Sequence, residues 1–123
     1  MKKNKKRDYI KIGILGGTFD PPHKGHLYIS KIALKKLRLK KILWIITKKN
    51  PLKNKPYLKL KERMKLSKEI TKENKKISIK YFDDKIRSTS TFNLLNYIKG
   101  KTKADLFFLM GFSWLWSILV FLI

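Results

Sequence analysis

The sequence predicts an α/β protein built on a doubly wound parallel sheet. Strand-like segments rich in isoleucine and leucine alternate with segments of helical periodicity, in the order βαβαβαβ. One strand-like segment is apolar at every position, as in a strand buried on both faces. The chain has 123 residues, of which 43% are hydrophobic, so it has the size of one domain and enough apolar surface for a packed core.

The first predicted elements are a strand, a long loop and a helix. Residues 1–8 form a basic polar tail that we expect to be loose. Tyr9–Leu15 is expected to be a strand that ends at Gly16 and Gly17. A loop follows from Thr18 to Gly25. The next segment has an apolar face at helical spacing, formed by Ile29, Ile32, Ala33 and Leu37.

The middle of the chain predicts a second strand and a second helix. Ile42–Thr47 is the continuous apolar run and is expected to be the buried strand. The dipeptides Asn50-Pro51 and Lys55-Pro56 bracket a loop. A helix is expected over Leu58–Asn74.

The last elements are shorter. Ile77–Phe82 is expected to be a third strand, with Asp83-Asp84 as the turn after it. Thr91–Lys99 predicts a helix that ends at Gly100 in the left-handed conformation. Asp105–Met110 is expected to be the fourth strand.

The predicted topology indicates where a ligand would bind. Parallel strands joined by right-handed helical crossovers place ligands beyond the carboxyl ends of the strands, where the strand order reverses. The loops at that edge are residues 16–26, 47–57 and 83–91.

The composition limits the possible functions. There is no cysteine, which excludes disulfides, thiolate metal sites and cysteine nucleophiles. No apolar segment of the signal-peptide type follows the basic N-terminus, so a cytoplasmic protein is expected. The net charge is +23, which favours attraction to anions. However, only four of the 31 basic residues are arginine, so we expect no specific nucleic-acid recognition and interpret the lysines mainly as surface residues.

The loop Gly16–His26 is the candidate functional site, because glycines, prolines and histidines are concentrated there at one strand-to-helix junction. Gly16 and Gly17 would let the backbone turn tightly and approach a ligand, and Gly25 would leave space at the start of the helix. His23 and His26 flank a helix N-terminus that favours anions, which predicts a phosphate site. The alternative is that both histidines only cap the turn. A zinc site is poorly supported, because these are the only two histidines and cysteine is absent.

The same loop resembles the nucleotidyltransferase superfamily with the His-x-Gly-His signature, in the pattern Gly-x-Phe-x-Pro-x-His-x-Gly-His. Every fixed position of that pattern is filled, by Gly17, Phe19, Pro21, His23, Gly25 and His26. The resemblance implies a Rossmann-like doubly wound fold.

Three further segments are similar to the nicotinate-nucleotide adenylyltransferases within that superfamily. They are the second strand with the loop Asn50–Lys53, the triplet Glu62-Arg63-Met64, and the segment Ser90–Leu95. The resemblance covers residues 10–111 and implies transfer of an adenylyl group from ATP to nicotinate mononucleotide, giving deamido-NAD and pyrophosphate, with Mg²⁺ on the phosphates of ATP.

The resemblance also implies roles for individual residues. His23 and His26 would be catalytic and would bind the phosphates of ATP. Lys53 would meet a phosphate, although a solvated surface lysine is an equal alternative. Thr91 would contact the nicotinate end of the acceptor, although it could equally be an ordinary first residue of a helix. The remaining ATP-binding positions that the resemblance implies are Gly16, Gly17, Thr18, Phe19 and Gly25.

The C-terminal residues depart from the family pattern. After Gly111 the family continues with an acidic segment, more of the sheet and a second phosphate-binding motif, whereas this chain continues as an apolar tail over residues 112–123. We interpret residues 9–111 as the N-terminal part of a nucleotidyltransferase domain and the tail as the product of a frameshift, which would leave the fourth strand with an uncovered edge and the chain impaired. A membrane anchor is the alternative, since residues 106–123 carry no charge.

Two other functions stay open. The chain could be a related enzyme that transfers to pantetheine phosphate or uses CTP. It could also be a non-enzymatic remnant, either free or attached to a membrane. The sequence makes no prediction about the oligomeric state.

Overall fold

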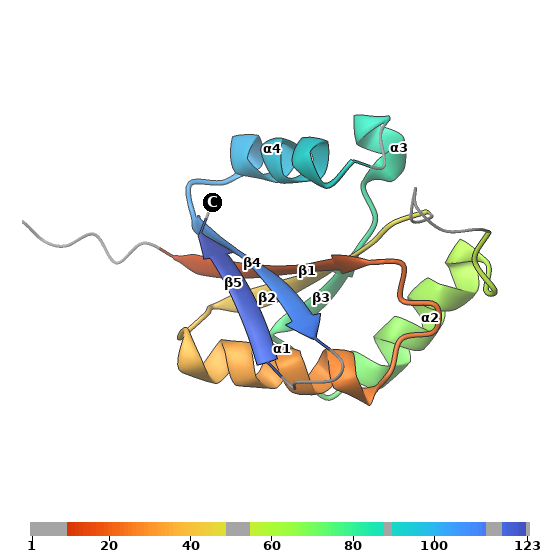
Figure 1. Cartoon of the computed structure of the whole chain (residues 1–123), viewed down its shortest axis with the longest axis horizontal. Helices are drawn as coiled ribbons and strands as arrows, with labels where there is room; N and C mark the ends of the chain where they lie inside the picture. Colours follow the sequence, from red (N-terminus) through yellow and green to blue (C-terminus); the bar gives the residue numbers. More distant parts are fainter. Residues whose placement is uncertain (1–9, 49–54, 88–89, 113–116, 123) are drawn as a thin grey trace, which may run out of the picture.

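The computed structural model describes residues 10–48, 55–87, 90–112 and 117–122. The last three residues of β4 and all of β5 are described by their backbone alone. Its centre is a five-stranded sheet with the order β3-β2-β1-β4-β5 (Figure 1). The first four strands are parallel, and β5 is antiparallel to β4. Their bounds are Lys11–Gly17, Lys41–Ile46, Ile77–Lys80, Asp105–Phe112 and Ser117–Leu122.

Helices cover both faces of the sheet, which confirms the predicted doubly wound α/β fold. Helices α1 (Lys24–Lys36) and α2 (Leu60–Thr71) lie on one face, and α3 (Asp83–Ile86) and α4 (Thr91–Lys101) lie on the other (Figure 1). Each face has its own apolar core. Ala33 of α1 packs with Trp44 on the first face, and Leu94 and Ile98 of α4 pack with Ile14 on the second.

The strand order reverses between β1 and β4. The chain moves outward from β1 to β2 and β3, and then returns to pair β4 with the other side of β1. The reversal lies where the loop after β1 leads into α1. The predicted ligand edge is therefore the edge of the sheet at which α1 begins.

Three predictions about the elements are wrong in detail. Gly100 lies inside α4 and not at a left-handed cap, because the helix continues to Lys101 and no described glycine has a positive φ. Asp83 and Asp84 begin the short helix α3 and do not form a simple turn. Gly16 and Gly17 are strand residues of β1, and the left-handed residue of the loop is Phe19, with φ 51°.

The edge of β4 is paired, contrary to our expectation. Backbone pairing runs from Phe107 opposite Leu122 to Phe112 opposite Ser117. Residues 117–122 therefore extend the sheet. Among the described residues, no helix is long and apolar enough to cross a membrane. The division of the chain near residue 111 stays a prediction, and the basic tail 1–8 lies outside the described residues.

Candidate functional site

The N-terminus of α1 is closed by two histidines that cap it reciprocally. His23 is the N-cap residue, and its Nδ1 accepts a hydrogen bond from the backbone N–H of Gly25 at 3.0 Å. His26 lies three positions later, and its Nδ1 accepts from the backbone N–H of His23 at 3.1 Å. This is the geometry of a capping box, with imidazoles in the places that serine or threonine and glutamate usually occupy.

The capping bonds determine which nitrogen of each ring carries the proton. A neutral imidazole has one N–H donor and one acceptor nitrogen, and both Nδ1 atoms act here as acceptors. The proton of each neutral ring is therefore assigned to Nε2. The two rings lie with centroids 4.0 Å apart, so two Nε2–H donors lie at the N-terminus of one helix. That arrangement suits an anion.

His26 is neutral at physiological pH. Burial, and then the neighbouring His23, lower the pKa of His26 from 6.5 to about 4. The buried surroundings are aromatic: the Phe19 ring lies 4.6 Å from the His26 ring and stacks on Trp44 at 5.0 Å, measured between centroids. His26 thus rests on a packed aromatic base, whereas His23 is exposed.

Hydrogen bonds tie the same base to α1. The indole Nε1–H of Trp44 donates to the hydroxyl of Ser30 at 2.8 Å, and that hydroxyl donates to the carbonyl oxygen of His26 at 2.8 Å. Trp44 and Ser30 are completely buried. The buried strand β2 therefore fixes the first turn of α1 and with it the position of His26.

Gly25 is required by the histidine cap itself. A Cβ at this position would lie 2.8 Å from both Cε1 and Nδ1 of His23. The structure shows one use of the space that we predicted at Gly25, which is room for the His23 ring. A Cβ at Gly16 or Gly17 would meet its neighbours only at ordinary contact distances of 3.8 Å or more.

The loop between β1 and α1 is anchored on the start of α2. The carboxylate of Asp20 accepts from the backbone N–H groups of Tyr57 and Leu58, at 2.6 and 2.8 Å. Arg63 donates through Nη1 to the carbonyl oxygens of Thr18 and Thr47, at 2.9 and 2.7 Å. Two side chains thus join the loops that follow β1 and β2.

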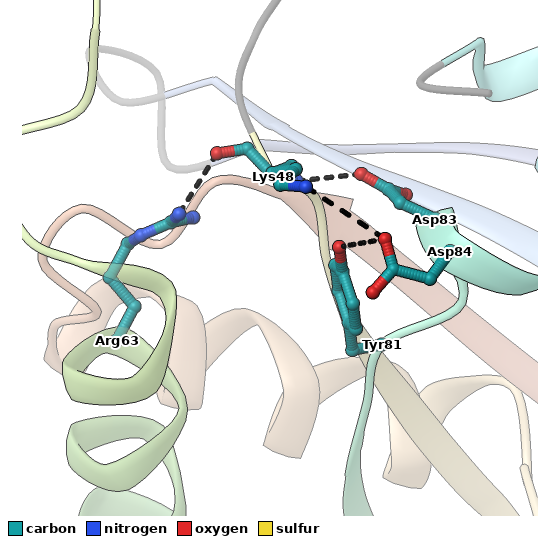
Figure 2. A network of polar contacts seen from close by, with 5 residues as sticks. All are labelled: Lys48, Arg63, Tyr81, Asp83 and Asp84. Carbon is teal, nitrogen blue, oxygen red and sulfur yellow. Dashed lines mark hydrogen bonds and ion pairs between the residues drawn. The ribbon is translucent and has the colours of Figure 1, made fainter. Parts of the chain in front are cut away.

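A polar network connects Arg63 of α2, through Lys48 after the end of β2, to Asp83 and Asp84 of α3 (Figure 2). The carbonyl of Lys48 accepts from Arg63 Nη2 at 2.9 Å, and its backbone N–H donates to the buried carboxylate of Asp83 at 2.7 Å. The Nζ of Lys48 lies 3.9 Å from Asp84, which also accepts from the Tyr81 hydroxyl at 3.1 Å. Burial and Asp84 raise the pKa of Tyr81 to about 12, and burial raises the pKa of Asp83.

The predicted site residues that the structure describes lie at the edge of the sheet where α1 and α4 begin. Gly16, Gly17, Thr18 and Phe19 lead from β1 into the histidine loop, and the Phe19 side chain is buried in the core. Thr91 is the exposed first residue of α4, behind the N-cap Ser90, on the opposite face of the sheet from α1. Lys53 lies outside the described residues.

The described residues suit a metal ion that arrives on its substrate better than one held by a protein cage. No group of three or more His, Cys, Asp or Glu side chains lies together within the described part of the chain. Both oxygens of the Asp20 carboxylate near the histidine loop already accept backbone N–H groups. Mg²⁺ is commonly bound through substrate phosphates and water, with few protein ligands.

Sequence reasoning named Arg63 only as part of the triplet Glu62-Arg63-Met64. It missed the supporting roles of five residues, namely Asp20, Ser30, Trp44, Arg63 and Asp83. One signal was present for Arg63, because it is one of only four arginines among 31 basic residues. Arginine in place of lysine favours a site where several fixed hydrogen bonds are made.

Comparison with known proteins supports the resemblance that the motifs indicated. A protein from Pelagibacter ubique named "Probable nicotinate-nucleotide adenylyltransferase" is 52% identical over 82% of this chain and 56% of the relative. A protein of the same name from Mesorhizobium japonicum is 36% identical over 83% of this chain and 53% of the relative. The chain therefore spans about half the length of the curated relatives it matches.

A solved structure has the same fold. Plasmodium falciparum nicotinic acid mononucleotide adenylyltransferase, complexed with NaAD, superimposes with a TM-score of 0.66 and 23% sequence identity. The match covers 84% of this chain and 52% of the other. The sequence pattern of the cytidylyltransferase-like family matches residues 14–115, which include the end of β1, the whole histidine loop and strands β2, β3 and β4. The chain belongs to the cytidylyltransferase-like family.

Proposed function

We propose that this chain carries the adenylyl-transfer site of a nicotinate-nucleotide adenylyltransferase. The observation that carries the proposal is the reciprocal histidine cap, which places two Nε2–H donors at the N-terminus of α1, beside the point where the strand order reverses. The names of the curated relatives support nicotinate mononucleotide as the acceptor.

The proposed reaction is an in-line displacement at phosphorus. A phosphate oxygen of nicotinate mononucleotide attacks the α-phosphorus of ATP, the bond from that phosphorus to the bridging oxygen breaks, and pyrophosphate leaves. The products are deamido-NAD and pyrophosphate, with no covalent intermediate on the protein. Catalysis then consists of positioning and stabilisation of charge on the transferring group.

The histidines suit this chemistry because they are fixed before the substrate arrives. His26 would donate from Nε2 to an oxygen of the α- or β-phosphate, and its neutral state avoids any proton loss on binding. His23 would donate beside it, and the dipole of α1 would add partial positive charge. Mg²⁺ would enter with ATP and neutralise its phosphates.

The acceptor side of the proposal rests on the segment that begins α4. Thr91 lies at the N-terminus of α4, and the N-termini of α1 and α4 lie at the same edge of the parallel sheet. We propose that Thr91 contacts the nicotinate end and that Lys53 contacts a phosphate. The lack of cysteine and the use of ATP favour the cytoplasm as the location.

The alternative enzyme is another nucleotidyltransferase of the same family, which would use CTP or transfer to pantetheine phosphate. To separate these activities, we would measure pyrophosphate release with ATP or CTP, each combined with nicotinate mononucleotide, nicotinamide mononucleotide or pantetheine phosphate. The proposal predicts release from ATP with nicotinate mononucleotide above every other pair. A clear preference for pantetheine phosphate or CTP would overturn it.

The chain spans about half the length of its curated relatives. The assay therefore compares it with a second protein that has the relatives' full length. We would run the 123-residue chain beside the same chain continued with the corresponding second half of the Pelagibacter ubique relative. We expect release from the extended protein, lost on His26→Ala. If neither protein binds ATP or releases pyrophosphate, the non-enzymatic reading replaces the proposal.

A further inference from the structure

We propose that Arg63 is the positioning residue of the histidine site: its buried guanidinium holds the loop after β1 against the exit of β2 and thereby fixes how His23 and His26 present their donors. This inference rests on the proposed function for its meaning in catalysis, but the positioning itself can be measured without any turnover.

The guanidinium makes four hydrogen bonds, and all of them go to backbone carbonyl oxygens. Nε donates to Leu58 at 3.0 Å, Nη1 donates to Thr18 and Thr47, and Nη2 donates to Lys48. The side chain is only 2% exposed. One rigid planar group thus joins three segments: the loop after β1, the exit of β2 and the start of α2 (Figure 2 shows its bond to Lys48).

The charge of Arg63 is stabilised by carbonyl dipoles and by the nearby charges of Asp20 and Asp83. Within the described part of the chain, the ion pairs are Lys48 with Asp84 and Lys72 with Glu69, and Arg63 is in neither. Burial nevertheless lowers the pKa of Arg63, and a buried cation is costly, so stability alone is a weak reason for its presence. It does place positive charge behind the loop that leads to the two histidines, which favours a polyanionic ligand.

Lysine could not replace this group. An ammonium has three donors at one point, whereas the four acceptors of Arg63 are spread over three segments and match the fork of a guanidinium. Arg63→Lys would therefore keep the charge but release one or more of the segments. The loop after β1 would retain Asp20 as its other side-chain anchor, so the fold would be kept while the histidine geometry loosens.

The two histidines are the only ones in the chain, and this makes them direct reporters. We would label histidine with ¹⁵N and record imidazole spectra of the parent, Arg63→Lys and Arg63→Gln between pH 4 and 8. In the parent at pH 8, where the rings are neutral, both should show a proton on Nε2 and none on Nδ1. In the Arg63 variants, the rings should show averaging of the two tautomers, and the pKa of His26 should rise toward 6.5.

Ile98→Val serves as the matched control, because Ile98 is buried in the core on the opposite face of the sheet. It should lower the melting temperature and leave both imidazole spectra unchanged. If Arg63→Lys folds and keeps the imidazole spectra and His26 titration of the parent, Arg63 is only structural and the inference is wrong.

A second measurement covers the case in which neither Arg63 variant folds. In the parent, hydrogen exchange of the Arg63 Nε–H and of the backbone N–H groups of His23 and Gly25 would be followed against urea. Positioning predicts that these three groups exchange through the same opening. If His23 and Gly25 exchange freely while the Arg63 Nε–H stays protected, the inference fails.

ATP binding separates this inference from the proposed function. If the parent binds ATP, we expect Arg63→Lys to weaken binding by about tenfold, in line with the cost of misplacing groups that contact a substrate. If the parent does not bind ATP, the proposed function fails, and the imidazole spectra still decide whether Arg63 positions the histidines.

Discussion

At the scale of a residue, the His23 ring leaves no room for a side chain at Gly25. A Cβ at Gly25 would lie 2.8 Å from the His23 ring, so Gly25→Ala must displace that ring and break its bond to the Gly25 backbone N–H. We expect ATP affinity to fall by about 1 kcal/mol, or roughly fivefold, for the loss of one hydrogen bond. Isothermal calorimetry measures this directly.

Gly100 provides the matched control for that substitution. It lies inside α4, and a Cβ there would meet nothing within 4 Å among the described residues. Gly100→Ala should stabilise the fold by about 0.5–1 kcal/mol through lower backbone entropy and leave ATP binding unchanged. Equal ATP affinity in Gly25→Ala and Gly100→Ala would contradict the role assigned to the His23 ring.

The pH dependence of stability follows from His26. Its pKa is about 4 in the folded protein and 6.5 in a free imidazole, so between these values the unfolded chain binds a proton that the folded chain excludes. The free energy of unfolding should therefore fall as the pH drops from about 6.5 to about 4. Urea unfolding of the parent and of His26→Asn at several pH values tests this. All other titratable groups are shared by the two proteins, so the difference between them reports on His26. If the free energies of unfolding of the two proteins change with pH by the same amount, this assignment is contradicted.

At the scale of elements, the attachment of α1 to β2 depends on one buried hydroxyl. Ser30 accepts from the indole N–H of Trp44, and Ser30→Ala would leave that N–H buried without its partner. We expect a loss of about 1–3 kcal/mol in the free energy of unfolding. Ser67 of α2 is the control, since it is equally buried and its hydroxyl has no partner among the described residues. Ser67→Ala should be neutral or stabilising, and equal losses for both variants would contradict this assignment.

The order of the four parallel strands and of α1, α2 and α4 was predictable because these elements have local patterns. The apolar run of β2 and the spacing in α1 indicate a parallel sheet without any tertiary information. The His23 and His26 positions at the start of α1 were predictable for the same reason, because the motif is local.

The supports of the site could not be predicted, because they depend on contacts between distant segments. Arg63 meets Thr18 across 45 positions, and Asp20 meets Leu58 across 38. The pairing of β5 with β4 was also missed, because residues 112–123 were interpreted as a tail outside the domain. Gly100 was assigned to a cap from its residue type, although the helix continues through it.

At the scale of the molecule, the length of the relatives leads to a prediction about turnover. The chain spans about half of the curated relatives. The resemblance implies a second phosphate-binding motif in the missing part, which can be added by extension. Two charge-assisted contacts of about 1.5–3 kcal/mol each, acting in the transition state, correspond to roughly 10²- to 10⁴-fold in rate. The extended protein should exceed the 123-residue chain by that factor in pyrophosphate release. Equal rates would show that the described fold is sufficient.

The net charge of +23 affects any measurement of anion binding. Non-specific attraction between a basic surface and ATP weakens as salt is added, whereas contacts in a partly buried site are screened less. Binding by the histidine site should therefore persist at 0.15 M salt, a concentration at which the Debye length is about 8 Å. A variant in which only the histidine site is lost should bind ATP more weakly than the parent at every salt concentration.

The most direct test of the histidine site is a calorimetric titration of ATP into the parent, His26→Ala and the control Asn96→Ala, which changes an exposed residue of α4. The titration is made at low salt and at 0.15 M salt. We predict that His26→Ala weakens ATP binding by about 1.5–3 kcal/mol, or roughly 10- to 150-fold, at both salt concentrations, because a donor to a charged phosphate is lost. Asn96→Ala should bind like the parent. If His26→Ala binds ATP as tightly as the parent at 0.15 M salt, the two histidines only cap a helix and the phosphate site does not exist.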